Sequence, residues 1–127
     1  MIFLDTNYLI RTLVAGTAEA EHVTGWINDD CDLCTGSVVW YEFLSGPVDE
    51  DGIDIVRAML DDRVLPFVSD AATEAARLYN LTGRVRRLRV DAMIAASAIV
   101  AGATLATGNT ADFLPFASHG LKLFSYM

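Results

Sequence analysis

Long apolar runs and an export signal are absent from this sequence. No hydrophobic stretch among the 127 residues reaches the roughly 20 residues that a membrane-spanning helix needs. The first residues, Met-Ile-Phe-Leu-Asp, have no basic segment ahead of the apolar one and carry an acid at position 5, unlike a secretory signal. We therefore expect a cytoplasmic protein that crosses no membrane.

Histidine and cysteine are scarce, and the chain has only two of each. His22 and His119 lack zinc-type spacing and evident catalytic partners, which argues against a zinc site and a Ser-His-Asp hydrolase. Cys31 and Cys34 form a lone Cys-Asp-Leu-Cys that Thr-Gly-Ser follows, where a thioredoxin-type pair would open a helix. We expect both cysteines to be reduced, to behave as small apolar residues, and to lie in or just before a strand.

Two further ligand motifs are missing. Residues 107–109, Thr-Gly-Asn, have neither the spacing nor the lysine of a phosphate-binding loop. The acidic stretch 49–54 has its glycine too early for a calcium loop and lacks the closing glutamate. A solvated helix start is the better interpretation of that stretch.

The composition is that of a folded protein with unevenly placed charge. With 53% hydrophobic and 20% charged residues, the chain can bury a core, and its length predicts a single domain over residues 1–127. A net charge of −8 at first argues against a nucleic-acid partner. However, ten of the 17 acids lie between residues 29 and 62. Four arginines fall within six positions: Arg84, Arg86, Arg87 and Arg89.

Strand-like and helix-like segments alternate along the chain. Short apolar runs predict strands at residues 2–4, 33–38, 64–68, 103–107 and 121–126. Helical periodicity and capping residues predict helices at residues 8–14, 17–27, 40–44, 53–60, 69–81 and 91–101. This alternation predicts an α/β fold with a mainly parallel sheet of about five strands, covered by helices on both faces. Ligands of such sheets bind at the carboxyl ends of the strands.

Four acidic residues are candidates for a site at that edge. Asp5 ends the first strand, where an uncompensated charge is costly, although residues 5–7 also suit a helix N-cap. Glu42 stands among apolar neighbours in a short helix, so its charge needs a partner. Asp91 begins an otherwise apolar helix, with capping as the alternative. Asp112 follows a polar loop after the fourth strand, where a solvated cap is the stronger alternative.

Carboxylates that converge in this way raise one another's pKa values, and a divalent cation removes that penalty. All-oxygen ligation favours Mg²⁺ or Mn²⁺ over zinc. Such an ion activates water and stabilises charge at phosphorus. The acids therefore predict hydrolysis of a phosphodiester by metal-activated water.

The arginine cluster directly precedes Asp91 and has three interpretations. It is a solvated helix end whose cations complement the C-terminal dipole, a clamp for a phosphate backbone, or a surface covered by an acidic partner. Its adjacency to Asp91 favours the clamp, which would lead a substrate with a phosphate backbone into the acidic site.

Four segments resemble, in order and in spacing, the motifs of PIN-domain nucleases. Asp5-Thr6-Asn7 resembles the opening motif, and residues 37–43 (SVVWYEF) are similar to the second acidic motif. Residues 90–98 (VDAMIAASA) resemble the third motif, and residues 107–113 (TGNTADF) the closing segment. With its small size, the chain resembles the VapC-type toxins of toxin–antitoxin pairs over nearly its whole length.

The resemblance implies a three-layer sandwich of helices around a parallel sheet, Mg²⁺ or Mn²⁺ as cofactor, and endonucleolytic cleavage of RNA. It also implies a homodimer and a cognate antitoxin that places a peptide in the acidic groove. By match, Asp5 and Asp91 would be the principal metal ligands, and Glu42 and Asp112 would complete the set. Asn109 is the alternative to Asp112. The residues in supporting positions are Thr6, Asn7, Asn109 and Thr107, which would orient the acids by hydrogen bonding.

Two other functions compete with this hypothesis. A phosphatase with Asp5 as nucleophile would need a second acid close by, which Thr6 and Asn7 do not supply. A non-catalytic module that binds RNA or a protein partner would have no need of the acidic set.

Overall fold

Five parallel strands form one sheet at the centre of the molecule. The computed structural model describes residues 1–125, and the order of its strands across the sheet is β3-β2-β1-β4-β5. The strands are short: β1 (Ile2–Leu4), β2 (Leu33–Gly36), β3 (Val64–Leu65), β4 (Thr104–Ala106) and β5 (Lys122–Leu123). This confirms the predicted α/β class and the parallel sheet. The last predicted strand is shorter than expected, and its Tyr126 lies outside the described residues.

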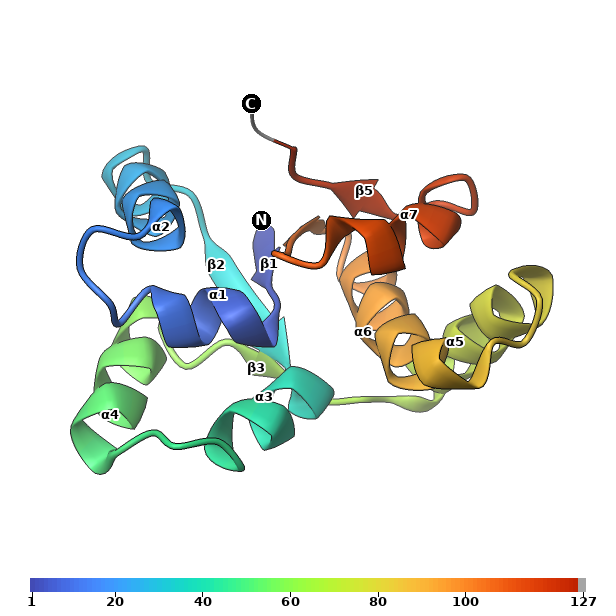
Figure 1. Cartoon of the computed structure of the whole chain (residues 1–127), viewed down its shortest axis with the longest axis horizontal. Helices are drawn as coiled ribbons and strands as arrows, with labels where there is room; N and C mark the ends of the chain where they lie inside the picture. Colours follow the sequence, from blue (N-terminus) through green and yellow to red (C-terminus); the bar gives the residue numbers. More distant parts are fainter. Residues whose placement is uncertain (126–127) are drawn as a thin grey trace.

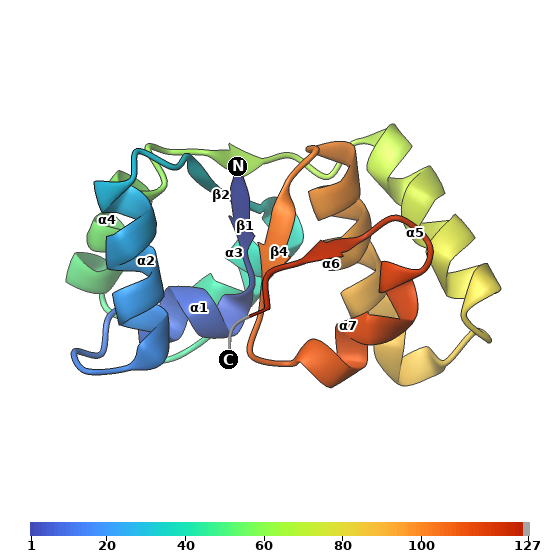
Figure 2. The same ribbon diagram turned by 90° about the horizontal axis from the view of Figure 1, so that it is seen from above.

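Helices cover the sheet on both sides, as Figures 1 and 2 show. Helices α1 (Thr6–Arg11), α2 (Ala18–Asn28) and α4 (Glu50–Met59) lie on one side. Helices α5 (Ser69–Leu81), α6 (Arg89–Val100) and α7 (Thr110–Ala117) lie on the other, and α3 (Ser37–Leu44) follows β2 without a loop. The three-layer architecture is therefore confirmed. Within residues 1–125, every helix is too short or too polar to cross a membrane.

The core explains why these segments adopt these positions. Phe3 and Leu4 of β1 are fully buried, as is Leu105 of β4 beside them. Helix α6 packs against β2 and β4 and buries all four of its alanines, as its nearly continuous apolar sequence predicts. Small side chains allow a helix to lie close to a sheet and to its neighbours α5 and α7.

Several boundaries differ from the predictions. Helix α1 begins at Thr6 and α3 at Ser37, each earlier than expected, so the strand predicted at residues 33–38 ends at Gly36. Helix α7 was not predicted, and Pro115 within it disguises its pattern because proline usually marks a helix end. Its buried Phe113 and Phe116 hold it on the core in spite of the missing backbone donor.

The cysteines and the acidic stretch lie where the sequence places them. Cys34 is buried in β2, Cys31 is exposed just before it, and both are free thiols. Burial raises the pKa of the Cys34 thiol to about 11, so it stays protonated and unreactive. Asp49 caps α4, with its carboxylate accepting a hydrogen bond from the Gly52 backbone N–H at 2.8 Å. The interpretation of residues 49–54 as a helix start is confirmed.

Candidate active site

Asp5 lies at the carboxyl end of β1, where the chain turns into α1. The residue is only 5% exposed, and each of its carboxylate oxygens accepts one hydrogen bond. Oδ1 accepts from the Thr6 backbone N–H at 2.8 Å, and Oδ2 accepts from the Thr107 hydroxyl at 2.7 Å. The predicted helix cap is therefore present, but it uses only one oxygen. Burial raises the pKa of Asp5 above its usual value. The hydrogen bonds from Thr107 and Thr6 lower the pKa, and the negative charge of Glu42 raises it further, so the net shift is upward.

The loop after β4 meets the first turn of α1 beside Asp5. The Thr107 hydroxyl, which donates to Asp5, also accepts from the Asn109 backbone N–H at 3.0 Å. The Gly108 backbone N–H donates to the Asn7 side-chain oxygen at 3.0 Å. Strands β1 and β4 are neighbours in the sheet, but α1 follows β1 on one side of the sheet and α7 follows β4 on the other. This point is therefore the switch point of the sheet, where ligands of open α/β folds bind.

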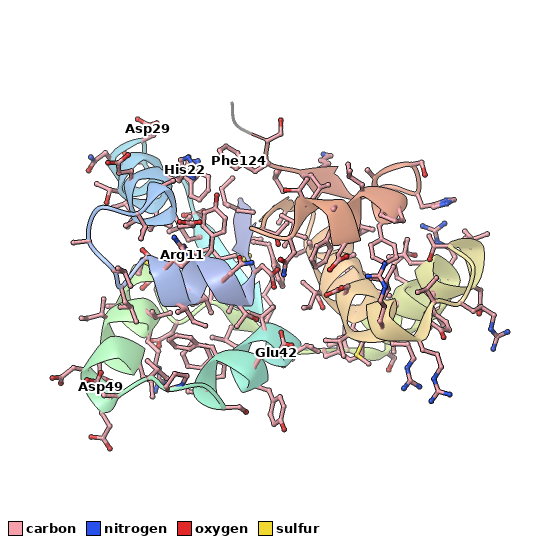
Figure 3. The ribbon with its side chains drawn as sticks, viewed as in Figure 1. Arg11, His22, Asp29, Glu42, Asp49 and Phe124 are labelled. Carbon is pink, nitrogen blue, oxygen red and sulfur yellow. The ribbon has the colours of Figure 1, made fainter. Side chains whose placement is uncertain are left out.

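Glu42 approaches the same point from α3. The Thr6 hydroxyl donates to Glu42 Oε1 at 2.8 Å, which fixes the carboxylate near the first residue of α1. Its side chain points from α3 toward that end of α1 (Figure 3). Helix α3 buries Val39 and Phe43 in the hydrophobic core. The apolar residues near Glu42 in the sequence therefore hold the helix on the core. The charge of Glu42 is left half-buried at the cleft.

Asp91 lies in the first turn of α6 and does not cap it. Leu88 holds the N-cap position, and no side chain caps this helix. Burial, together with the charges of Asp5, Asp112 and Glu42, raises the pKa of Asp91 to about 6, while Arg87 acts in the opposite direction. A carboxylate whose ionised form is opposed by three other carboxylates lies in a concentrated negative field. The capping alternative therefore does not explain Asp91.

Asp112 lies in the first turn of α7, at the border of this group. Its Oδ1 accepts a hydrogen bond from Arg87 Nη1 at 3.0 Å. The pKa of Asp91 is raised by Asp112, so the two carboxylates interact. Asn109, the alternative to Asp112, precedes α7 and lines the cleft itself. The solvated-cap interpretation of Asp112 is wrong, because its partner is Arg87 and the N-cap position belongs to Asn109.

A cleft of about 230 Å³ joins these residues. Its lining comes from α1, α3, α6 and the segments after β1 and β4, and consists of Asp5, Thr6, Asn7, Ile10, Glu42, Asp91, Ile94 and Asn109. Ile10 and Ile94 were not among the site residues predicted from the sequence. Helical spacing is the signal that reveals them, since Ile10 follows Thr6 by four residues and Ile94 follows Asp91 by three. They are the apolar part of the lining, with Ile94 buried and Ile10 41% exposed.

The donor set of the cleft fits a hard divalent cation. Its polar groups are carboxylates, hydroxyls and amides, and burial together with the neighbouring carboxylates raises the pKa of Asp91 in spite of the opposing charge of Arg87. In residues 1–125, no group of three or more His, Cys, Asp or Glu side chains is arranged so that it could hold a metal ion. An open arrangement suits Mg²⁺, which keeps several waters and takes only one or two carboxylates from a protein.

The arginine cluster occupies the connection between α5 and α6. The chain reverses at Gly83 and Arg84, which have φ of +91° and +56°, and then forms a short 3-10 turn at Arg86–Leu88. The helix-end interpretation holds for Arg84, whose backbone N–H donates to the Tyr79 carbonyl at the C-terminus of α5. It does not hold for Arg86, Arg87 and Arg89, which lead into the N-terminus of α6, where the helix dipole does not favour cations.

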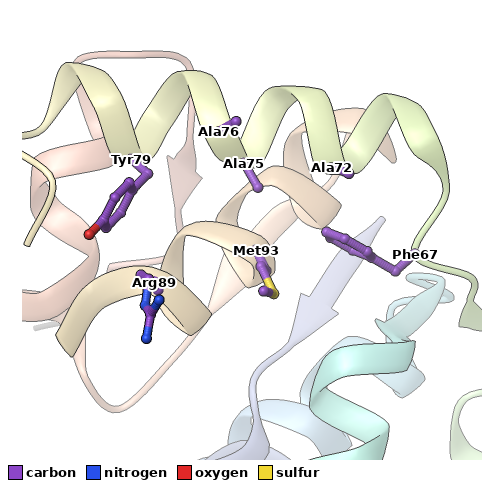
Figure 4. Close-up of a pocket in the computed structure, with 7 residues that line it drawn as sticks. All are labelled: Phe67, Ala72, Ala75, Ala76, Tyr79, Arg89 and Met93. Atoms are coloured by element: carbon purple, nitrogen blue, oxygen red, sulfur yellow. The ribbon is translucent and has the colours of Figure 1, made fainter. Parts of the chain in front are cut away.

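The four arginines do not share one environment. Arg87 pairs with Asp112 beside the acids. Arg89 instead lines an apolar groove of about 220 Å³ between α5 and α6, with Phe67, Ala72, Ala75, Ala76, Tyr79 and Met93 (Figure 4). This groove has no lining residue in common with the acidic cleft. Arg84 and Arg86 are exposed in the connection itself.

Solved structures share this fold at low sequence identity. The FitAcB structure from Neisseria gonorrhoeae has 21% identity and a TM-score of 0.71, covering 98% of this chain and 97% of that one. The VapBC2 structure from Rickettsia felis, bound to a DNA fragment from its promoter, has 19% identity and a TM-score of 0.73, with full coverage of both chains. VapBC-1 from nontypeable Haemophilus influenzae has 18% identity and a TM-score of 0.70, with 98% coverage of each.

Sequence comparison gives the family. Curated protein sequences gave no significant match. The family description that matches is "PIN domain", and it matches residues 2–115, from β1 into α7. All the acids of the cleft lie within this range. The chain is therefore a member of the PIN domain family.

Proposed function

We propose that this protein is a metal-dependent endoribonuclease that hydrolyses phosphodiester bonds of RNA. The observation that carries the proposal is the cleft where Asp5, Glu42 and Asp91 meet and where burial and the neighbouring carboxylates raise the pKa of Asp91 to about 6. Carboxylates that lie close together repel one another and destabilise the folded protein unless a cation binds between them. Such an arrangement is typical of a functional site.

Mg²⁺ or Mn²⁺ is the proposed cofactor. Asp5 and Asp91 would be its principal ligands, with Glu42 beside them and Asp112 or Asn109 at the border. When bound, the cation would supply Lewis-acid stabilisation of charge at phosphorus and activation of water.

The residues around the acids hold them in position. Thr107 fixes Oδ2 of Asp5, and Thr6 fixes Oε1 of Glu42. Asn7 joins the first turn of α1 to the loop after β4 through Gly108. Side chains held in this way need little reorganisation when a charged ligand arrives.

The arginine cluster supplies the proposed contact with the RNA backbone. Arg84, Arg86 and Arg87 lie in an exposed segment that leads into the helix carrying Asp91. Guanidinium groups bind phosphate in a bidentate fashion and contribute a salt-dependent, sequence-independent affinity. Arg89 belongs to the same proposal through its position in sequence, although its groove is a separate surface.

We also propose that the protein is the toxin of a toxin–antitoxin pair, that it acts in the cytoplasm as a homodimer, and that a cognate antitoxin covers the acidic cleft. Support comes from the similar structures, among them one described as a toxin-antitoxin complex from Klebsiella pneumoniae, at 22% identity, a TM-score of 0.71 and at least 90% coverage of both chains. Co-purification of a small protein encoded beside the gene, should the two be co-expressed, tests the antitoxin part.

The test of the activity is cleavage of an end-labelled RNA by the purified chain with Mn²⁺, with Mg²⁺ and with EDTA. We expect cleavage with the cations only, and loss of cleavage in Asp5→Asn and Asp91→Asn. Asp70→Asn is the matched control, because Asp70 is an exposed acid in the first turn of α5. RNA binding without cleavage would favour a non-catalytic module, and cleavage that survives both cleft substitutions would exclude this active site.

A further inference from the structure

Buried polar side chains are few in this molecule and lie in one place. Among residues 1–125, with tyrosine and cysteine counted as apolar, they are those of Asp5, Thr35 and Thr107. A polar group is costly to bury unless it is hydrogen-bonded, so the bonds of these three side chains matter to the fold. Asp5 and Thr107 belong to the acidic cleft and its loop. Thr35 does not line the cleft and lies outside the four motif-like segments of the sequence.

Thr35 lies in β2 and is fully buried beside the end of β1. Its hydroxyl donates to the Leu4 backbone carbonyl at 2.8 Å. The registered pairing of β1 with β2 ends at Phe3 and Cys34, so this side-chain bond extends the contact between the two strands by one residue. Leu4 is the last residue of β1, and Asp5 follows it directly. The hydroxyl therefore acts at the point where the chain leaves the sheet.

The peptide group between Leu4 and Asp5 is held from both neighbouring strands. Its carbonyl accepts from Thr35 of β2, and its N–H donates to the Ala106 carbonyl of β4 at 3.0 Å. Because a peptide group is planar, two bonds on opposite sides restrict its rotation, and that rotation sets the direction in which the Asp5 side chain leaves the backbone. Thr107 then holds the carboxylate itself. One threonine thus fixes the backbone of Asp5 and the other its side chain.

Thr35 also connects this point to the helix that carries Glu42. Helix α3 begins two residues after Thr35, at Ser37. The backbone N–H of Thr35 donates to the Arg63 carbonyl, next to β3, at 3.0 Å. Thr35 is therefore bonded to the chain on both sides of β2, and it fixes the start of α3 relative to the residue before Asp5.

We propose that Thr35 is a positioning residue of the acidic cleft, which holds Asp5 in place through the Leu4–Asp5 peptide group. The inference rests on the proposed metal-dependent activity of the cleft. Residues that orient the ligands of a metal without touching it typically change metal affinity or activity by about 10- to 100-fold when they are removed. Thr35 acts through the backbone, so we expect an effect at the lower end, about tenfold.

The test is Mn²⁺ affinity, measured by titration calorimetry on the full chain for two pairs of proteins that differ in the hydroxyl. Wild type and Thr35→Val have side chains of nearly equal volume, and Thr35→Ser and Thr35→Ala form a second pair without the methyl group. We expect the member without the hydroxyl to bind Mn²⁺ about tenfold more weakly in each pair. In RNA cleavage at one fixed Mn²⁺ concentration, kcat should fall and KM for RNA should stay unchanged, because a fully buried side chain does not touch the substrate.

Thr82→Val is the matched control. The Thr82 hydroxyl likewise donates to a backbone carbonyl, that of Leu78 at 2.7 Å, but it lies at the end of α5 and outside the lining of the cleft. This variant should lower the melting temperature and leave Mn²⁺ affinity unchanged.

Thermal unfolding with EDTA shows which variants are folded, and if Thr35→Val is not, the serine and alanine variants decide. Equal Mn²⁺ affinity within either folded pair, or an equal loss of affinity in Thr82→Val, would overturn the positioning role of Thr35. Wild-type Mn²⁺ binding that Asp5→Asn does not weaken would instead overturn the proposed metal site itself.

Discussion

The Thr107 hydroxyl donates to Asp5 Oδ2 at 2.7 Å, a bond between residues 102 positions apart that joins the ends of neighbouring strands β4 and β1. Thr107 is 3% exposed and Asp5 is 5% exposed, so the hydrogen bond lies in a largely buried part of the cleft. The same hydroxyl accepts from the Asn109 backbone. One threonine thus fixes both the deepest carboxylate of the cleft and the loop that leads to α7.

Thr107→Val tests this relationship. The substitution keeps the volume but leaves Asp5 Oδ2 and the Asn109 N–H without their partner, so we expect the free energy of unfolding to fall by about 1–3 kcal/mol. RNA cleavage should fall as well, because Asp5 is no longer held in one orientation. Urea denaturation measures the first effect and initial cleavage rates the second. Thr107→Ser keeps the hydroxyl and should retain most of both; equal losses in the two variants would contradict the hydrogen-bond argument.

Asp91 should make the metal-free protein less stable as pH rises. Its folded-state pKa is about 6 and its ordinary value 3.8, so between these values the folded protein retains a proton that the unfolded chain has lost. Stability therefore falls with rising pH through this window, and the penalty is complete above it. Asp91→Asn removes the penalty. We expect this variant to match wild type near pH 4 and to exceed it at pH 8, with EDTA present.

Urea denaturation of the two proteins at several pH values gives the comparison. The difference between them isolates Asp91 from other groups, such as Glu19 and Glu74, whose pKa values are lowered and whose effect on stability has the opposite sign. A difference that stays constant between pH 4 and pH 8 would show that Asp91 titrates normally.

Much of the fold follows from the sequence because its signals are local. Helix α5 begins and ends at the predicted residues, since Ser69 and Asp70 open an amphipathic pattern that stops before Gly83. The start of α3 was misplaced because Ser37-Val38-Val39 has strand-like residues, whereas the pairing of Gly36 with Leu65 is the last rung between β2 and β3. The length of β2 depends on how far its partner β3 extends, and the sequence around β2 does not reveal this.

The site likewise has a part that the sequence predicts and a part that it does not. Parallel topology predicts that Asp5 and the segment after the fourth strand meet at one edge, and the structure places Asp5 and Thr107 there. The partner of Asp112 was not predictable, because it depends on the turn at Gly83–Arg84 that brings Arg87 beside α7. The same turn leaves Arg89 in a different groove, although only two positions separate it from Arg87.

Mn²⁺ should stabilise the folded protein through the cleft acids. A ligand at 100 times its dissociation constant stabilises the folded state by about 2.7 kcal/mol, so the melting temperature should rise with Mn²⁺ concentration. Asp5→Asn should abolish the rise, since it removes a proposed principal ligand. Asp70→Asn should keep it. Differential scanning calorimetry with and without EDTA measures the shift, and a rise that persists in Asp5→Asn would place the cation elsewhere.

A side chain at Gly108 should be accommodated only by displacement of the Asn7 amide. A Cβ at Gly108 would lie 2.9 Å from Asn7 Nδ2 and 3.2 Å from its Cγ, whereas a Cβ at Gly25 of α2 has no neighbour within 4 Å. We expect Gly108→Ala to displace the Asn7 amide, break its bond to the Gly108 N–H and lower RNA cleavage, with a loss of about 1 kcal/mol in stability. Gly25→Ala should be neutral or slightly stabilising, because alanine favours a helix.

A double-variant cycle decides whether the Asn7 contact is the cause. In an Asn7→Ala background the atoms that clash with the new Cβ are absent, so Gly108→Ala should cost less cleavage and less stability than it does alone. The measurements are urea denaturation and initial cleavage rates for the four proteins. If Gly108→Ala is as harmful without the Asn7 amide as with it, the backbone of the loop, and not its contact with Asn7, requires glycine at this position.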